Sequence, residues 1–334
     1  MVKRLLQHIK LGWVMSAMLC IMAANALAAG KDDSKWLPQG ASVSKDIVYK
    51  ETALGDLRLD LYMPAGKDRE ARPVVLFIHG GSWMHGNKEE ITSGYRIPLL
   101  RRLLEAGIAV ASMDYRLVND SMTVVYPKPL ADCKDAVRWL MGNAAQLGID
   151  GDRIALMGTS AGGHLALMTA YAPDSLAQDV HPLSHLATRV RCVVDIYGPT
   201  DLCKILRPAL PPTAVAVAST MVGKEYIDTR NCLLWAFSGE SNAHPLRRRR
   251  ACQRYSPINY VKTAVPTIAI HGNADRLVPY HQSEMLRKAL KEQGMDMEIV
   301  TLEGLPHGFK GITAQQVSTL VDRTLQFLNE NLLK

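Results

Sequence analysis

The chain has 334 residues, of which 48% are hydrophobic and 21% charged, and its formal net charge is +7. This balance supplies enough apolar material for a packed core and excludes an intrinsically disordered chain. Strand-like and helix-like stretches alternate without a linker-like break, so we expect one large α/β domain rather than two. The sequence has no run that interleaves basic and aromatic residues, so nucleic acid is not an expected partner.

Residues 1–29 have the composition of a secretory signal peptide. The basic head MVKRLLQHIK precedes the apolar run LGWVMSAMLCIMAAN, and ALAA supplies the small residues of a cleavage site. We expect cleavage near Ala28 and a periplasmic or secreted protein that keeps no stable membrane anchor. The alternative is an uncleaved anchor, because the apolar run is nearly long enough to span a bilayer. A lipoprotein is disfavoured, since Cys20 follows Leu19 rather than a small residue.

Removal of this segment takes away three basic residues and no acidic one, so the formal charge of residues 30–334 is +4. Five cysteines remain, and an exported protein meets an oxidising compartment in which disulfides persist. Cys133 and Cys192 lie in helical and strand patterns and are predicted to be buried thiols. Cys203, Cys232 and Cys252 cluster in an irregular region and could supply one bridge.

Strands and helices alternate along most of the remaining chain. Residues 46–51 and 57–64 are predicted to form a hairpin, and residues 90–105 carry helical spacing. Apolar runs typical of strands buried on both faces are found at residues 73–81 and 107–116. Further strands are predicted at residues 153–158, 189–199, 265–272 and 295–304. Helical patterns are found at residues 129–148, 161–172, 280–294 and 315–333. This order predicts a mostly parallel, eight-stranded sheet covered by helices on both faces.

Residues 201–255 interrupt that order. The stretch LRPALPPTAVAVAST contains three prolines and cannot form one regular helix. It falls between two strands, at the end of the sheet where loops carry catalytic groups. We interpret residues 201–255 as a cap insertion over the site, and the alternative is a surface excursion without a role there.

A serine stands at the point where one of these strands becomes a helix. Residues 158–162 read GTSAG, which fits the G-x-S-x-G pattern of a nucleophile elbow. Glycine at the flanking positions removes clashes between the tight turn and its neighbours. The turn would expose the Ser160 hydroxyl above the sheet, at the positive end of the following helix. The sequence therefore predicts Ser160 as a nucleophile.

The motif HGGSW, residues 79–83, ends an earlier strand. Paired glycines let backbone N–H groups turn toward an incoming carbonyl oxygen, as an oxyanion hole requires. We expect Gly81 N–H and Ala161 N–H to be the donors, with Gly80 allowing the close approach. Trp83 is expected to serve packing or to form a pocket wall.

A general base and an acid should follow the serine in the order Ser, Asp, His. Of the ten histidines, His307 is the one in a glycine-flanked loop after the last strand, within the sequence LPHGF. It is therefore the expected base for Ser160. His271, at a strand end, and His164, on the helix after the serine, are expected to be packed or capping residues.

Asp275 is the expected acid, because it lies in the loop after the strand that ends in AIHG. A buried carboxylate in that role fixes the histidine tautomer and stabilises the imidazolium. Asp195 and Asp201 are the alternatives, since both lie close to the end of the preceding strand.

Together these motifs resemble the α/β-hydrolase superfamily, in the branch related to hormone-sensitive lipase and the bacterial feruloyl and acetylxylan esterases. The resemblance covers about residues 45–330 and rests on HGGSW, MDYRL, DCKDAVRWL, GIDGDRIALMGTSAGGHLAL, HGNADRLVP and PHGF. It implies the α/β-hydrolase fold and a catalytic triad of Ser160, Asp275 and His307.

The same resemblance implies that Asp114 and Arg116, in MDYRL, are scaffold residues near the site. The chain departs from the family pattern at Thr159, where an acidic or another small polar residue is expected. We expect Thr159 to tune the elbow rather than to remove its function.

The function predicted from these observations is that of an exported serine esterase acting through an acyl-enzyme. Its expected substrates are short-chain or aromatic acyl esters, such as acetyl or feruloyl groups on carbohydrate, and it requires no metal and no cofactor. Within the fold, the alternatives are a peptidase similar to prolyl oligopeptidase and an amidase similar to arylformamidase. A catalytically silent binding module is the alternative from a different class.

Overall fold

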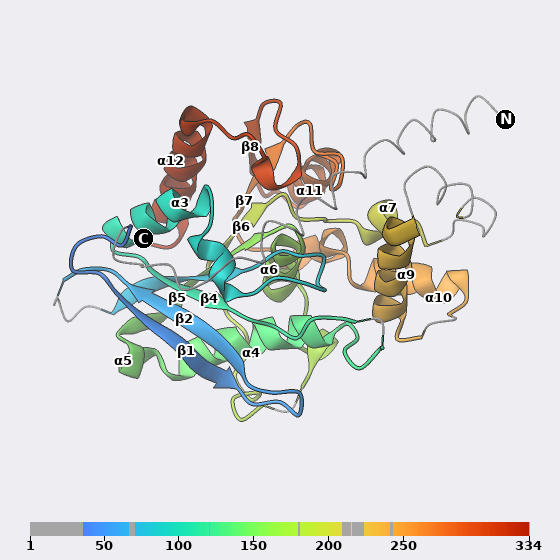
Figure 1. Cartoon of the computed structure of the whole chain (residues 1–334), viewed down its shortest axis with the longest axis horizontal. Helices are drawn as coiled ribbons and strands as arrows, with labels where there is room; N and C mark the ends of the chain where they lie inside the picture. The colour runs from blue at the N-terminus through green and yellow to red at the C-terminus, as the bar shows by residue number, and fades with distance from the viewer. Residues whose placement is uncertain are drawn as a thin grey trace.

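The computed structural model of the chain describes residues 36–66, 71–119, 121–179, 181–208, 215, 224–240 and 243–333. Its centre is one eight-stranded sheet with the strand order β1-β2-β4-β3-β5-β6-β7-β8 (Figure 1). The strands are β1 (Ser42–Lys50), β2 (Leu57–Met63), β3 (Arg72–Ile78), β4 (Ala109–Met113), β5 (Ile149–Thr159), β6 (Cys192–Ile196), β7 (Thr267–Gly272) and β8 (Glu298–Leu302). The predicted signal peptide, residues 1–29, lies outside the described residues.

The sheet is mixed but mostly parallel, as predicted. β1 pairs antiparallel with β2, and β2 pairs antiparallel with β4. Every other neighbouring pair is parallel, so the carboxyl ends of the six strands from β4 to β8 meet at one edge. Ligand and catalytic sites of open α/β sheets lie beyond that edge.

Helices cover both faces of the sheet (Figure 1). α3 and α12 pack on one face with alternate strand residues such as Val75 and Phe77, and α4, α6 and α11 pack on the other with Val74 and Leu76. The α-helices are α3 (Arg96–Glu105), α4 (Lys128–Gly142), α5 (Ala144–Leu147), α6 (Ala161–Tyr171), α7 (Leu202–Leu206), α9 (Lys224–Ser238), α10 (Pro245–Arg254), α11 (His281–Lys291) and α12 (Ala314–Asn331). Short 3-10 helices are η3 (Lys88–Thr92), η4 (Asp174–Ala177), η5 (Pro257–Thr263) and η6 (His307–Phe309).

Two predicted helices differ from the structure in extent. The pattern at residues 129–148 is broken at Asn143, whose side chain donates a hydrogen bond to the Trp139 carbonyl at 2.8 Å. Asparagine side chains compete with the backbone in this way, so α4 ends there. Gly148, with φ of 70°, ends the second segment as predicted. The spacing over residues 90–105 forms a regular α-helix only from Arg96, after η3.

The described part of residues 201–255 forms α7, α9 and α10, which lie together at one end of the molecule (Figure 1). All five cysteines outside residues 1–29 are free thiols, and Cys133 and Cys192 are buried as predicted. Cys203 of α7 and Cys252 of α10 have their thiols in contact. Among the helices that the structure describes, none has both the length and the apolar composition needed to cross a membrane.

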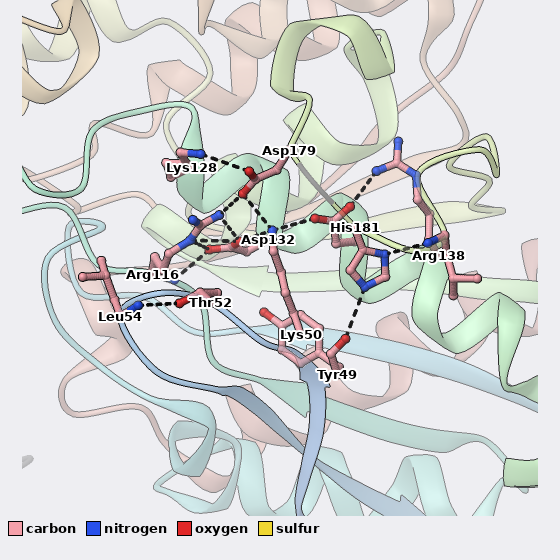
Figure 2. A network of polar contacts seen from close by, with 12 residues as sticks. Tyr49, Lys50, Thr52, Leu54, Arg116, Lys128, Asp132, Arg138, Asp179 and His181 are labelled. Atoms are coloured by element: carbon pink, nitrogen blue, oxygen red, sulfur yellow. Dashed lines mark hydrogen bonds and ion pairs between the residues drawn. The ribbon is translucent and has the colours of Figure 1, made fainter.

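A buried ionic cluster joins β1 to α4 on the α4 face of the sheet (Figure 2). Lys50 Nζ lies 2.8 Å from Asp132, 2.6 Å from Asp135 and 3.0 Å from Asp179. Arg116 donates to Asp132 and Asp179 as well. The three carboxylates are close enough together to hold a cation, and the chain itself supplies one as the Lys50 ammonium.

We expect Lys50→Met to lower the free energy of unfolding by about 3–5 kcal/mol, because it leaves buried carboxylates with too little positive charge. The side chain of Lys50 is only 2% exposed. Lys128→Met is the matched control, since Lys128 also contacts Asp179 but is 43% exposed, and its loss should cost at most about 1 kcal/mol. Urea unfolding of both variants measures the two free energies. Equal losses of unfolding free energy would contradict the expectation that the buried ion pairs of Lys50 stabilise the fold more than the exposed pair of Lys128.

Candidate active site

Ser160 lies between the end of β5 and the start of α6, in a backbone conformation that non-glycine residues rarely adopt. Its φ is 54° and its ψ is −118°. Both flanking glycines are required by close contacts, because a Cβ on Gly158 would lie 2.2 Å from the Gly162 oxygen, and one on Gly162 would lie 2.0 Å from the Ile78 oxygen. The turn therefore holds Ser160 strained at the carboxyl edge of the sheet.

The structure brings Ser160, His307 and Asp275 together, although up to 147 residues separate them along the chain. His307 Nε2 lies 2.9 Å from Ser160 Oγ, and His307 Nδ1 lies 2.6 Å from Asp275 Oδ2. His307 begins η6, after β8, and Asp275 follows β7. Because a carboxylate only accepts, His307 Nδ1 carries the proton, and Nε2 is left to accept from the serine hydroxyl.

Asp275 is fixed by its own loop. Its Oδ1 accepts hydrogen bonds from Leu277 N–H and Val278 N–H, both at 2.9 Å, and its Oδ2 lies 3.3 Å from His271 Nε2. Burial alone would raise the pKa of Asp275, but hydrogen bonds from His271 and His307 lower it to about 2. The carboxylate is therefore ionised at neutral pH.

The two alternative acids lie elsewhere. Asp201 caps α7, where its side chain accepts from Cys203 N–H and Lys204 N–H. Asp195 is fully buried in β6, and its Oδ1 accepts from Gly198 N–H. Burial raises the pKa of Asp195 to about 6. Neither carboxylate contacts His307.

The HGGSW turn lies directly against the elbow. A Cβ on Gly80 would lie 3.0 Å from the Thr159 oxygen, which is closer than ordinary van der Waals contact and favours glycine there. Gly81 has φ of 97°. Within the described part of the chain, neither Gly81 N–H nor Ala161 N–H donates a hydrogen bond. Gly80 N–H differs, because it donates to Glu90 Oε2 at 2.9 Å.

An aromatic cluster connects this turn with the nucleophile helix and α9. Trp83 Nε1 donates to His164 Nδ1 at 3.3 Å, and His164 Nε2 lies 2.7 Å from the Tyr255 oxygen. Phe237 of α9 packs edge-on against Trp83, with 5.4 Å between the ring centroids. His164 is thus a packed residue, as predicted, and burial lowers its pKa to about 4.

The two residues expected to be scaffold have structural contacts. Asp114 accepts from Lys88 N–H at 2.8 Å, which fixes the start of η3. Arg116 belongs to the ionic cluster around Lys50 (Figure 2). His271, expected to be packed or capping, is buried and also contacts Asp275.

Sequence reasoning missed two residues beside the site. Tyr197, with φ of 46°, packs edge-on against His307, with 4.8 Å between the ring centroids. The Tyr197 hydroxyl lies 2.6 Å from the Tyr95 hydroxyl. Glu90 contacts both the HGGSW turn and Thr159. A carboxylate within ten residues of the paired glycines was the only available signal for Glu90, and nothing in the sequence distinguishes Tyr197.

The strand order, the elbow at Ser160 and the loops after β7 and β8 define an α/β-hydrolase fold. Solved structures agree: the apo form of Thermogutta terrifontis esterase 2 matches with a TM-score of 0.65 and 26% identity, covering 87% of this chain and 95% of that one. A truncated carbohydrate esterase from gut microbiota shares the fold, with a TM-score of 0.65 and 23% identity. The match covers 86% of this chain and 96% of the esterase.

The chain belongs to the BD-FAE family, whose model matches residues 59–290. Among curated proteins it is similar to esterase LipC of Mycobacterium tuberculosis, with 28% identity over 277 residues, which covers 81% of this chain and 62% of LipC. The chain therefore spans about three fifths of that relative's length.

Proposed function

We propose that this protein is a serine esterase in which Ser160 is the nucleophile, His307 the general base and acid, and Asp275 the carboxylate that orients His307. The observation that carries the proposal is the hydrogen-bonded chain Asp275–His307–Ser160, with distances of 2.6 and 2.9 Å. The esterases among the similar proteins support it.

In the proposed reaction, Ser160 Oγ attacks the ester carbonyl carbon while its proton passes to His307 Nε2. The carbonyl oxygen takes up the negative charge between Gly81 N–H and Ala161 N–H, neither of which donates a hydrogen bond within the described part of the chain. His307 then donates its proton to the leaving alcohol, which leaves an acyl-enzyme. Water attacks the acyl carbon by the same route, with His307 again as base, and releases the acid.

For the substrate, we propose esters of short acyl chains or aromatic acids, including acetyl or feruloyl groups on carbohydrate. The described part of residues 201–255 reaches the HGGSW turn through Phe237, which is 4% exposed and packs on Trp83. We take Phe237 and Trp83 as the apolar side of the acyl pocket, and a pocket closed on that side favours a small acyl group. Two solved structures of Thermogutta terrifontis esterase 2 contain short-chain acids. The propionate-bound structure is 26% identical to this chain and the butyrate-bound structure 25%.

We expect kcat/KM for nitrophenyl esters to be highest at acyl chains of about two to four carbons. A methylene that finds room gains about 0.8 kcal/mol, whereas one that does not must displace packed side chains. A confined pocket therefore produces an optimum followed by a steep loss. Rates for two- to twelve-carbon esters, with acetylated xylan and feruloyl esters in parallel, measure this. A maximum near decanoyl would indicate an open groove and contradict the cap.

We further propose that the protein is exported and cleaved near Ala28, on the basis of the composition of residues 1–29. Protein recovered from its native host should begin at Ala29 or Gly30. N-terminal sequencing tests this, and Met1 on membrane-bound material would support the uncleaved anchor instead.

A further inference from the structure

One carboxylate contacts both backbone segments that carry the proposed oxyanion donors. Glu90 Oε2 accepts from Gly80 N–H at 2.9 Å, and Glu90 Oε1 accepts from Thr159 Oγ1 at 2.8 Å. Gly80 immediately precedes Gly81, and Thr159 lies two residues before Ala161. Glu90 thus links the HGGSW turn to the elbow through one hydrogen bond to each.

Arg96 fixes the position of the Glu90 side chain. Arg96 Nε donates to the Glu90 backbone oxygen at 2.8 Å, and Arg96 Nη1 lies 3.5 Å from Glu90 Oε1. The two side chains are only 12% and 16% exposed, so solvent screens this pair weakly. Burial alone would lower the pKa of Arg96, but the nearby Glu90 charge raises it, so the guanidinium stays protonated beside Glu90.

The opposite side of the glycine turn is fixed as well. The Gly80 oxygen accepts from Tyr115 Oη at 3.2 Å and lies 2.8 Å from His79 Nδ1, which must be the donor because a carbonyl oxygen only accepts. The C=O and N–H of one trans peptide point in opposite directions. With the Gly80 oxygen held by Tyr115 and His79, Gly81 N–H must point away from them.

We propose that Glu90 is a positioning residue that sets the spacing of Gly81 N–H and Ala161 N–H for the transition state. It does so through Gly80 on one side and Thr159 on the other, and it does not touch the substrate. The proposal rests on the proposed serine esterase function. It also gives Thr159, the departure from the family pattern, a defined partner.

Glu90→Ala should reduce kcat for a nitrophenyl acetate by about 100-fold and leave KM nearly unchanged, because oxyanion donors act mainly in the transition state. Glu90→Gln should recover much of this loss, since its amide can accept from Gly80 N–H while donating to Thr159 Oγ1. Thr159→Val should cause a smaller loss than Glu90→Ala, because the contact to Gly80 survives. Glu89→Ala, on the same 3-10 helix but exposed, is the matched control and should retain wild-type kcat.

A trifluoromethyl ketone separates positioning from general stability. It forms a bond between its carbonyl carbon and Ser160 Oγ, the serine proton moves to His307, and the ketone oxygen becomes an oxyanion. Inhibitor affinity across the variants should fall in parallel with kcat/KM. If Glu90→Ala and Thr159→Val lower the melting temperature but keep wild-type kcat and inhibitor affinity in the folded fraction, the proposal is overturned. Inactive wild-type protein would instead refute the serine esterase itself.

Discussion

Ser160→Ala should lower esterase turnover by several orders of magnitude, with a folded protein and an unchanged melting temperature. Alanine fits the elbow, whose required glycines are Gly158 and Gly162 rather than residue 160. Without Oγ there is no atom to form the acyl-enzyme, and only binding and the oxyanion donors remain to assist water. Steady-state rates for a nitrophenyl acetate, with circular dichroism as a folding check, measure this effect.

A second readout does not depend on the choice of substrate. An organophosphonate should label the wild-type protein once, on the peptide that contains Ser160, and should not label Ser160→Ala. Ser318→Ala is the control, because Ser318 lies on the exposed face of α12, where its hydroxyl donates to Asp322 at 3.0 Å. A Ser160→Ala variant that retains more than about a tenth of wild-type turnover would remove Ser160 from the proposed mechanism.

Asp275→Asn should lower kcat by about 10⁴-fold, although the two side chains have nearly the same shape. Leu277 N–H and Val278 N–H both point at Oδ1, so an asparagine must place its amide oxygen there. Its NH2 group then faces His307 Nδ1, which lies 2.6 Å from Oδ2 in the wild type. The histidine would have to accept at Nδ1 and carry its proton on Nε2, where it cannot act as base for Ser160.

The alternative acids provide matched controls for this substitution. Asp195→Asn and Asp201→Asn should keep kcat within about tenfold of the wild type, because neither carboxylate contacts His307. Nitrophenyl acetate turnover of the three variants compares the positions directly. A greater loss for Asp195→Asn or Asp201→Asn than for Asp275→Asn would assign the orienting role to β6 or to the start of α7.

The sequence by itself determined the features that depend on local sterics and local pattern. G-x-S-x-G predicts the elbow because Cβ atoms at Gly158 and Gly162 would collide with backbone nearby in the fold, whatever the partner residues are. The continuous apolar runs at β3 and β4 predict parallel strands, since such strands are buried on both faces. The helical spacing over residues 129–148 predicted a single helix and missed the end of α4 at Asn143, whose side chain bonds the Trp139 carbonyl.

Only the tertiary structure decided which groups meet. Asp195, Asp201 and Asp275 all lie near the carboxyl ends of strands, but the order β6-β7-β8 places the loop after β7 beside the one that carries His307. Asp195 is instead turned toward Gly163 under α6. Glu90 is a similar case, because its contact with Thr159 spans 69 residues. Such pairings follow from strand order and side-chain direction across the sheet, which no local pattern in the sequence encodes.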